Sequence, residues 1–510
     1  MKFLDVLGQR LEEWSEERFY LAVLSAMASV VAATVLSFAL YLHWNFVMIA
    51  CDTAGFQSAI VNTLHGNWFR DSAYDGPNLL GQHSFFVVLL LVPIYALFPY
   101  VQTLFVLQIV GVYSTVVPLY LVTREIVGRA GTAFLVAAGA LASPLLLHMA
   151  LAPFHVETWF SAAVLWSYYF YRRDRARAFW LSFCFAVSCA EQVAMIYVAL
   201  GLALVVFEDG VPWRRKYGVF ALAGGLAWLV FSFGVLFPLM HRPEQDSVMA
   251  DHYSQWGVNS TMGLIAAVWG DPFKAVLMWL GPGRWFHLLE LVGLPLALAF
   301  LSRRSLILLL PFPLYFLMAK LQFYLYFHAY YFQFAFFAGY MGLAIFLARS
   351  EVSKRIGQAT IAATILGNVL TATVAISTYV IFGANGGEEL NGAIHREFDR
   401  ISRDAAVYSP HRYSAYLSNR DNMVMGDLRE DDLDFDAMIE AKAKTTDVHA
   451  AQIDYIVCDV DNDQCGWRQD NYDTETSKKR AANIQRLLES GEWKLFWNQS
   501  NVIILKRAGE

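Results

Sequence analysis

The feature that most constrains this chain is an apolar run over residues 21–42 that contains no charged side chain. A run of this length and character predicts a helix that crosses a lipid bilayer once. Further apolar runs follow it, and over the whole chain hydrophobic residues make up 57% of the positions and charged residues only 16%. A water-soluble protein could not bury so large an apolar share, so we expect most of the chain to lie in lipid.

Lysine and arginine residues indicate which side of the membrane each loop faces, because cytoplasmic loops are enriched in them. The basic residues cluster in short loops near residues 124–129, 172–177, 214–216, 303–304 and 349–355. If these loops lie inside, residues 84–98, which contain Pro93, form an interfacial helix instead of a span. The first external loop then extends over residues 43–100, and the C-terminal segment faces outward.

This topology predicts an α-helical polytopic membrane protein with about eleven transmembrane helices and a small C-terminal α/β domain. We expect the membrane domain to occupy residues 1–383 and the extracytoplasmic domain residues 384–510. The predicted spans are residues 20–42, 101–122, 130–147, 158–171, 178–189, 193–207, 218–239, 285–300, 305–319, 331–348 and 358–382.

The C-terminal segment shows patterns typical of mixed strands and helices. Residues 454–459 predict a strand and residues 477–490 a helix, which Gly491 ends. Residues 492–498 and 501–506 predict a closing hairpin.

The charge and the cysteines of this segment bear on its partners and its compartment. Residues 385–510 hold 24 acidic and 16 basic side chains, a balance that argues against nucleic-acid binding. Cys458 and Cys465 could form a disulfide if the segment faces an oxidising compartment.

Polar side chains that are unusual beside apolar helices collect at the predicted outer ends of the spans. They are Asp52, His83, His155, Glu157, Glu191, Gln192, His328, Tyr330 and Tyr331. Each one alone has a structural explanation, as a helix cap or as a satisfied group at the membrane interface. Charged groups at membrane helices are costly unless they are paired, hydrated or used, and Glu191 lies between two apolar runs. The convergence of these residues on one face therefore predicts a site.

A metal site is less well supported by the sequence. Asp459, Asp461, Asp463 and Asp470 have the spacing of a calcium-binding loop, but Gln464 stands where the tight turn of such a loop requires glycine. We assign no metal ligands and no certain cofactor, and a divalent cation is the one cofactor left open.

Several motifs are shared with a known family over nearly the whole chain. They are residues 51–66, 80–83, 93–99, 154–157, 328–331, 416–420 and 491–507, with the segment around Glu191. In these motifs the chain resembles the multi-pass bacterial and archaeal membrane proteins known as domain of unknown function 2079. That family is similar to the GT-C superfamily of membrane glycosyltransferases, which carry an acidic residue in the first external loop and use polyprenyl-phosphate donors.

The resemblance implies a glycosyltransferase at the outer face of a bacterial inner membrane, with a glycan, a lipid or a protein as acceptor. Asp52 would be the general base, in a catalytic group with His83, Glu157 and Glu191. The substrate-binding candidates are Arg70, His155, Arg284, Lys320, His328 and Tyr330, several of which could stabilise the charge on a lipid phosphate.

The chain departs from the family pattern at Gln57, Gln82 and Gln192, where acidic residues are common. The alternative hypothesis is therefore a catalytically silent membrane subunit whose outer domain binds a partner protein or a glycan. A transporter is a third hypothesis, which the lack of an internal repeat disfavours.

Overall fold

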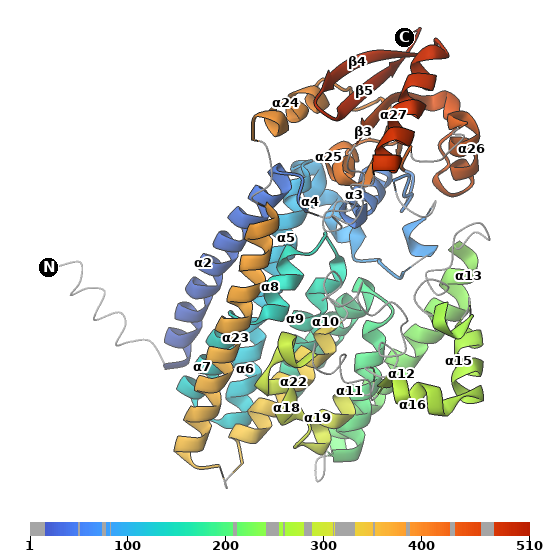
Figure 1. Cartoon of the computed structure of the whole chain (residues 1–510). Coiled ribbons are helices and arrows are strands. Elements are labelled where there is room, and N and C mark those ends of the chain that lie inside the picture. Colours follow the sequence, from blue (N-terminus) through green and yellow to red (C-terminus); the bar gives the residue numbers. More distant parts are fainter. Residues whose placement is uncertain are drawn as a thin grey trace, which may run out of the picture.

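The structure is a computed structural model that describes residues 16–48, 51–73, 78–81, 83–207, 212–240, 254–258, 261–279, 288–309, 311, 332–349, 352–383, 388–428, 434–460 and 474–509. Its helices form an elongated bundle, and a small sheet with its own helices covers one end of that bundle (Figure 1). Helices α2 (Glu16–Trp44) and α23 (Lys354–Gly383) lie along the same side of the bundle, although they are far apart in the sequence.

Among the described residues, four helical stretches are long and apolar enough to cross a membrane. These are Glu16–Trp44, Val101–Val127, Arg215–Met240 and Lys354–Ser377. The second consists of α5 (Val101–Ser114) and α6 (Val116–Val127). The third begins in α12 (Pro212–Phe231) and continues through a π-helical turn, η3 (Ser232–Leu236), into α13 (Phe237–Met240). A fifth span results if the pair α7 (Ala130–Ala140) and α8 (Pro144–Leu151), bent by 47°, counts as one.

The other helices of the bundle are short. They are α9 (Phe160–Arg172), α10 (Ala176–Cys189), α11 (Val193–Phe207), α15 (Thr261–Gly270), α16 (Pro272–Trp279), α18 (Leu294–Ala299), α19 (Arg303–Leu308) and α22 (Gln333–Leu347). Helices α10 and α11 coincide with two predicted spans, but their 14 and 15 residues fall below the ~20 that cross a bilayer. The predicted number of eleven spans is therefore not confirmed.

The described residues of the predicted first external loop contain three short helices. They are α3 (Cys51–Leu64), η1 (Leu79–Gly81) and α4 (Val88–Leu97). Helix α4 holds Pro93 and has only 10 residues, as the predicted interfacial helix requires. It exposes Leu90 and Leu97, and Phe98 follows it on the surface, so this side of α4 suits a lipid interface.

The outer helices present apolar side chains to their surroundings. Val30 of α2, Val230 of α12 and Val374 of α23 are 67%, 70% and 64% exposed. Apolar surface on this scale would be a liability in water but is expected where a helix faces lipid. The chain is a membrane protein on this ground as well as on its hydropathy.

Helices α11 and α12 pack backbone to backbone. A Cβ atom on Gly201 of α11 would lie 2.5 Å from the amide nitrogen of Leu222 and 2.6 Å from the carbonyl oxygen of Gly218, both in α12. Glycine at such a crossing allows the close contact that drives helix association in lipid.

The described C-terminal residues, from Glu388 onward, form the C-terminal region. It begins with α24 (Glu388–Asp399) and contains β1 (Ala406–Ser409), η6 (His411–Tyr413), α25 (Ser414–Leu417), β2 (Met423–Met425), α26 (Phe435–Thr446), η7 (Ala450–Gln452), β3 (Ile453–Asp459), α27 (Thr474–Glu489), β4 (Trp493–Gln499) and β5 (Val502–Arg507). The sheet order is β2-β1-β3-β5-β4, with parallel pairing of β1 to β2 and β3, and antiparallel pairing of β5 to β3 and β4. The predicted strand, helix and hairpin are confirmed.

The two faces of this sheet bury different clusters, because successive side chains of a strand point to opposite sides. Tyr455 and Val457 of β3 pack in a cluster with Phe46 and Cys51 from the first part of the chain. The alternate residues Ile456 and Cys458 pack in a second cluster, which contains residues of α26 and α27. The predicted pairing of Cys458 involves Cys465, which lies outside the described residues.

Gly201→Ala should destabilise the bundle, by about 1–3 kcal/mol, because its methyl group would overlap backbone atoms that cannot rotate away. Thermal unfolding in detergent measures this effect. Gly367→Ala in α23 is the control, since no atom lies within 4 Å of a Cβ there. Equal unfolding temperatures for the two variants would contradict the close packing.

Candidate active site

Helix α3 carries the residue that the sequence marks most strongly. Asp52 lies in its first turn, and its side chain is 18% exposed. Apart from Asp52 and the terminal Leu64, every residue of α3 is buried. The helix is thus enclosed on all sides, and its carboxylate is the polar group at its partly open end.

His155 faces this carboxylate from the segment between α8 and the short helix η2 (Val156–Trp159). Its Nδ1 atom lies 3.0 Å from the carbonyl oxygen of Pro153, to which an Nδ1–H group would donate. Its Nε2 atom lies 3.8 Å from Oδ2 of Asp52, a separation too long for a hydrogen bond. A hydroxyl group between these two atoms could contact both.

Gln108, in the middle of α5, holds the segment that carries His155. Its Nε2 atom donates to the carbonyl oxygens of Met149 and Ala152, at 3.0 and 2.9 Å. Its Oε1 atom accepts from the backbone nitrogen of His155 at 2.7 Å. Gln108 was not among the predicted site residues, although an amide in the middle of an apolar helix was a signal that could have found it.

His83 and Glu191 form a buried ion pair that joins the segment between η1 and α4 to the α10–α11 connection. Nδ1 of His83 lies 2.9 Å from Oε1 of Glu191, and the backbone nitrogen of Ser84 donates to Oε2 at 3.1 Å. Both carboxylate oxygens of Glu191 are therefore used. A buried carboxylate with two such partners can remain ionised.

Glu157 lies in η2 and is almost fully buried. Its backbone carbonyl oxygen accepts from Nε2 of Gln333, in α22, at 2.8 Å. Its carboxylate atom Oε2 has no hydrogen-bond partner among the residues that the structure describes, and the same is true of Nε2 of Gln192. Atoms of this kind are suited to receive a polar ligand.

The environment shifts the ionisation of these groups, which all lie outside the spanning helices. Burial raises the pKa of Asp52 to about 6, although the nearby His83 opposes the shift. Burial acts to lower the pKa of His83, but the charge and hydrogen bond of Glu191 outweigh it and raise that pKa. Burial acts to raise the pKa of Glu191, and its interactions with His83 and Ser84 lower it overall. Near neutral pH the site thus holds a carboxylate that can accept a proton beside a histidine that tends to be charged.

The structure brings together five of the predicted site residues. Asp52, His155 and the pair His83–Glu191 lie close to one another, and Glu157 is near enough to His83 for its charge to affect the pKa of that histidine. Arg70 does not join them, because its guanidinium group contacts the C-terminal region. The other candidates, Arg284, Lys320, His328 and Tyr330, lie outside the described residues, as does Gln82.

Gln57 belongs to a different contact. Its Nε2 atom donates to the hydroxyl group of Tyr95 at 2.6 Å, and its Oε1 atom accepts from the hydroxyl group of Ser418 at 2.7 Å. The side-chain amide of Gln57 therefore connects α3 to α4 and to the C-terminal region, so glutamine at this position has a structural role. Within the described part of the chain, no three histidine, cysteine, aspartate or glutamate side chains are arranged to hold a metal ion.

Comparisons with known proteins place the fold. A crystal structure of ArnT from Cupriavidus metallidurans bound to undecaprenyl phosphate matches with a TM-score of 0.50 and 12% sequence identity, over 94% of this chain and 97% of that one. ArnT from the same organism in the apo state matches with a TM-score of 0.45 and 14% identity, over 94% and 98% of the two chains. The first likeness shows that this chain has an ArnT-like fold.

The sequence comparisons place the chain in a family. A search of the curated proteins found no match. The family described as "Predicted membrane protein (DUF2079)" matches residues 42–504, which include the whole of the site above. The chain therefore belongs to the DUF2079 family of membrane proteins.

Proposed function

We propose that this protein is a membrane glycosyltransferase that transfers a sugar from a polyprenyl-phosphate donor to an extracytoplasmic acceptor. The observation that carries the proposal is the partly open carboxylate of Asp52, with a raised pKa, facing His155 and the His83–Glu191 pair. The ArnT-like fold supports the lipid donor, since that ArnT structure holds undecaprenyl phosphate.

The reaction would be a single inverting displacement. Asp52 takes the proton from the acceptor hydroxyl group while the oxygen of that group attacks the anomeric carbon. The bond from this carbon to the phosphate oxygen breaks, and the polyprenyl phosphate leaves with the electron pair. His83, which stays protonated to higher pH than a free histidine, can stabilise the negative charge that develops on the leaving phosphate.

Glu157 and Gln192 would bind the sugar. Both side chains are buried and, within the described part of the chain, each has an atom without a hydrogen-bond partner. Hydroxyl groups of a sugar can supply the missing partners, which would fix the orientation of the anomeric carbon.

The structural use of Gln57 weakens the alternative of a silent subunit. A carboxylate lost from a catalytic site would leave a glutamine in that site, whereas Gln57 connects Tyr95 to Ser418 at the contact with the C-terminal region. We therefore favour the enzyme.

Asp52→Asn should lower turnover by roughly 100-fold or more, because the amide cannot accept the proton of the acceptor. Transfer from a radiolabelled polyprenyl-phosphate sugar in proteoliposomes measures this rate, and binding of the lipid donor should be unchanged. Glu475→Gln, at an exposed position in the first turn of α27, is the matched control. Full activity of Asp52→Asn would favour the silent subunit.

The rate of transfer should rise with pH and reach half its maximum near pH 6, because Asp52 acts only when ionised. Glu191→Gln should move this midpoint to higher pH. The substitution removes the carboxylate that keeps His83 charged, and that charge lowers the pKa of Asp52. A pH–rate profile of the two proteins checks this shift, and an unchanged midpoint would argue against the coupling.

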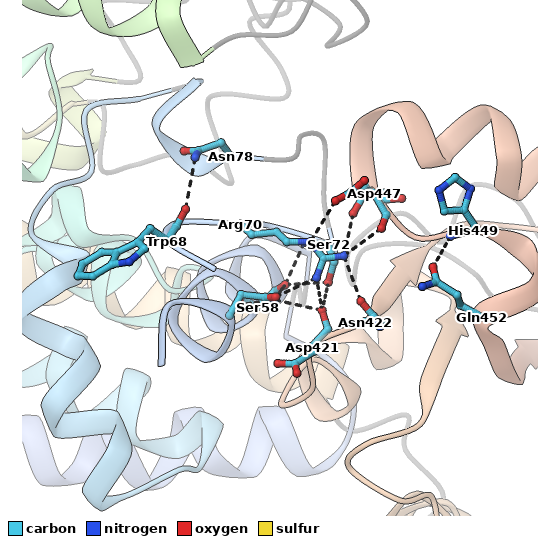
Figure 2. Close-up of polar contacts among 12 residues, drawn as sticks. Ser58, Trp68, Arg70, Ser72, Asn78, Asp421, Asn422, Asp447, His449 and Gln452 are labelled. Carbon is cyan, nitrogen blue, oxygen red and sulfur yellow. Dashed lines mark hydrogen bonds and ion pairs between the residues drawn. The ribbon is translucent and has the colours of Figure 1, made fainter. Parts of the chain in front are cut away.

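We also propose that α3 and the C-terminal region both face the extracytoplasmic side of a bacterial inner membrane, because the basic loops lie at the opposite ends of the helices. In a Cys184→Ser background, an impermeant maleimide applied to intact cells should label Asn78→Cys and Gln452→Cys (Figure 2). Ala176→Cys, at the exposed start of α10 and between Arg175 and Arg177, should react only after permeabilisation. Labelling of just one of the two outer positions would refute this topology.

A further inference from the structure

Helix α3 has two faces that meet different parts of the protein. Thr53 and Phe56 face the helical bundle, where the hydroxyl oxygen of Thr53 accepts from the backbone nitrogen of Phe154 at 2.9 Å and the two phenylalanine rings pack 5.3 Å apart. On the opposite face, Ala54 packs in the cluster shared with the C-terminal region. Asn62, two helical turns further along this face, donates to the carbonyl oxygen of Asp421 at 3.1 Å.

Arg70 adds several hydrogen bonds on this second face (Figure 2). Its Nη1 atom donates to Oδ1 of Asn62 at 2.9 Å and to the carbonyl oxygen of Asp421 at 3.0 Å. Its Nη2 atom donates to Oδ1 of Asn422 at 3.0 Å and to the carbonyl oxygen of Asp447 at 3.1 Å. One guanidinium group thus connects α3 to two separate segments of the C-terminal region, a geometry that its planar, multiply donating fork suits.

Ser58 and Ser72 extend the same contact. Their hydroxyl groups lie 3.1 Å apart, and the hydroxyl group of Ser72 donates to the carbonyl oxygen of Asp421 at 2.9 Å. The backbone nitrogen of Met423 donates to Ser72 at 3.2 Å, so the start of β2 is held as well. The carbonyl oxygen of Asp421 therefore lies at the centre of the contact and accepts from Arg70, Asn62 and Ser72.

Apolar packing holds the other end of α3. Cys51, its first residue and the neighbour of Asp52, is buried in the cluster that Ala54 shares with the C-terminal region.

We propose that the C-terminal region is clamped to α3 at both ends and thereby positions Asp52, with Arg70 as the positioning residue of the polar end. This inference rests on the proposed function for the role of Asp52, but the clamp itself does not. It reassigns Arg70 from binding of a lipid phosphate to support of the catalytic helix. In this proposal the C-terminal region supports the active site and is not an accessory binding module.

The physical reason is the stiffness of a helix. Asn62 and Asp52 are ten positions apart, or ~15 Å along the axis, so a shift at one end is transmitted to the other. Displacements of about 1 Å at a reacting group can cost 100-fold in rate. If the second face of α3 loses its partners, water also reaches Asp52, whose pKa burial otherwise raises.

Hydrogen exchange tests the clamp without reference to any activity. In full-length protein in nanodiscs, Arg70→Ala should speed amide exchange in the peptide that contains α3, and Asn422→Ala, which removes a single contact, should do so to a smaller extent. Arg400→Ala is the matched control, because that arginine is exposed and pairs with Glu397 within the C-terminal region. Unchanged exchange in α3 of a folded Arg70→Ala protein would overturn the clamp and leave the proposed function intact.

Kinetics test the positioning. Arg70→Ala should lower kcat by roughly 10- to 100-fold with a smaller change in KM, and it should move the acid limb of the pH–rate profile to lower pH as Asp52 becomes hydrated. Arg70→Lys should restore part of kcat. A raised KM at constant kcat, with the pH profile unmoved, would overturn the positioning role in favour of direct substrate binding. If Asp52→Asn is fully active while Arg70→Ala loosens α3, the proposed function fails and the clamp stands.

Discussion

The enclosure of α3 is the constraint on which the rest of this structure depends. A helix that carries a carboxylate at one end is packed on one face by the helical bundle and on the other by the C-terminal region. Apolar burial along the helix can offset the cost of keeping Asp52 in a poorly hydrated place. The catalytic candidates on other elements, His155 and the His83–Glu191 pair, are then arranged around the one end of the helix that remains partly open.

The polar groups of the site follow a common rule. A charge near the bilayer is tolerated where a partner compensates it, as Glu191 is compensated by His83 and by the backbone of Ser84. Glu157 departs from this rule, because within the described residues its Oε2 atom has no hydrogen-bond partner. In the proposed site, a ligand and not the protein would supply the hydrogen-bond partner of this Oε2 atom.

Sequence patterns predicted the elements that depend on local chemistry. The apolar run after residue 20, the interfacial helix with Pro93 and the C-terminal strand over residues 454–459 all have counterparts in the structure. Hydropathy alone did not establish the number of spans, because several apolar stretches form helices that are too short to cross a bilayer by themselves. The length of a helix depends on where the chain bends, and the position of a bend depends on how the helices pack against one another.

For the site, the sequence determined which side chains are available and, through the basic loops, that Asp52, His83, His155, Glu157 and Glu191 gather at the same end of the helices. Only the tertiary structure decided what each one contacts. Arg70 was a predicted substrate-binding residue, and Gln57 stands where acidic residues are common in the family, yet both contact the C-terminal region, more than 350 positions away. Hydrogen bonds between such distant segments are set by how the chain packs, a property that no local pattern encodes.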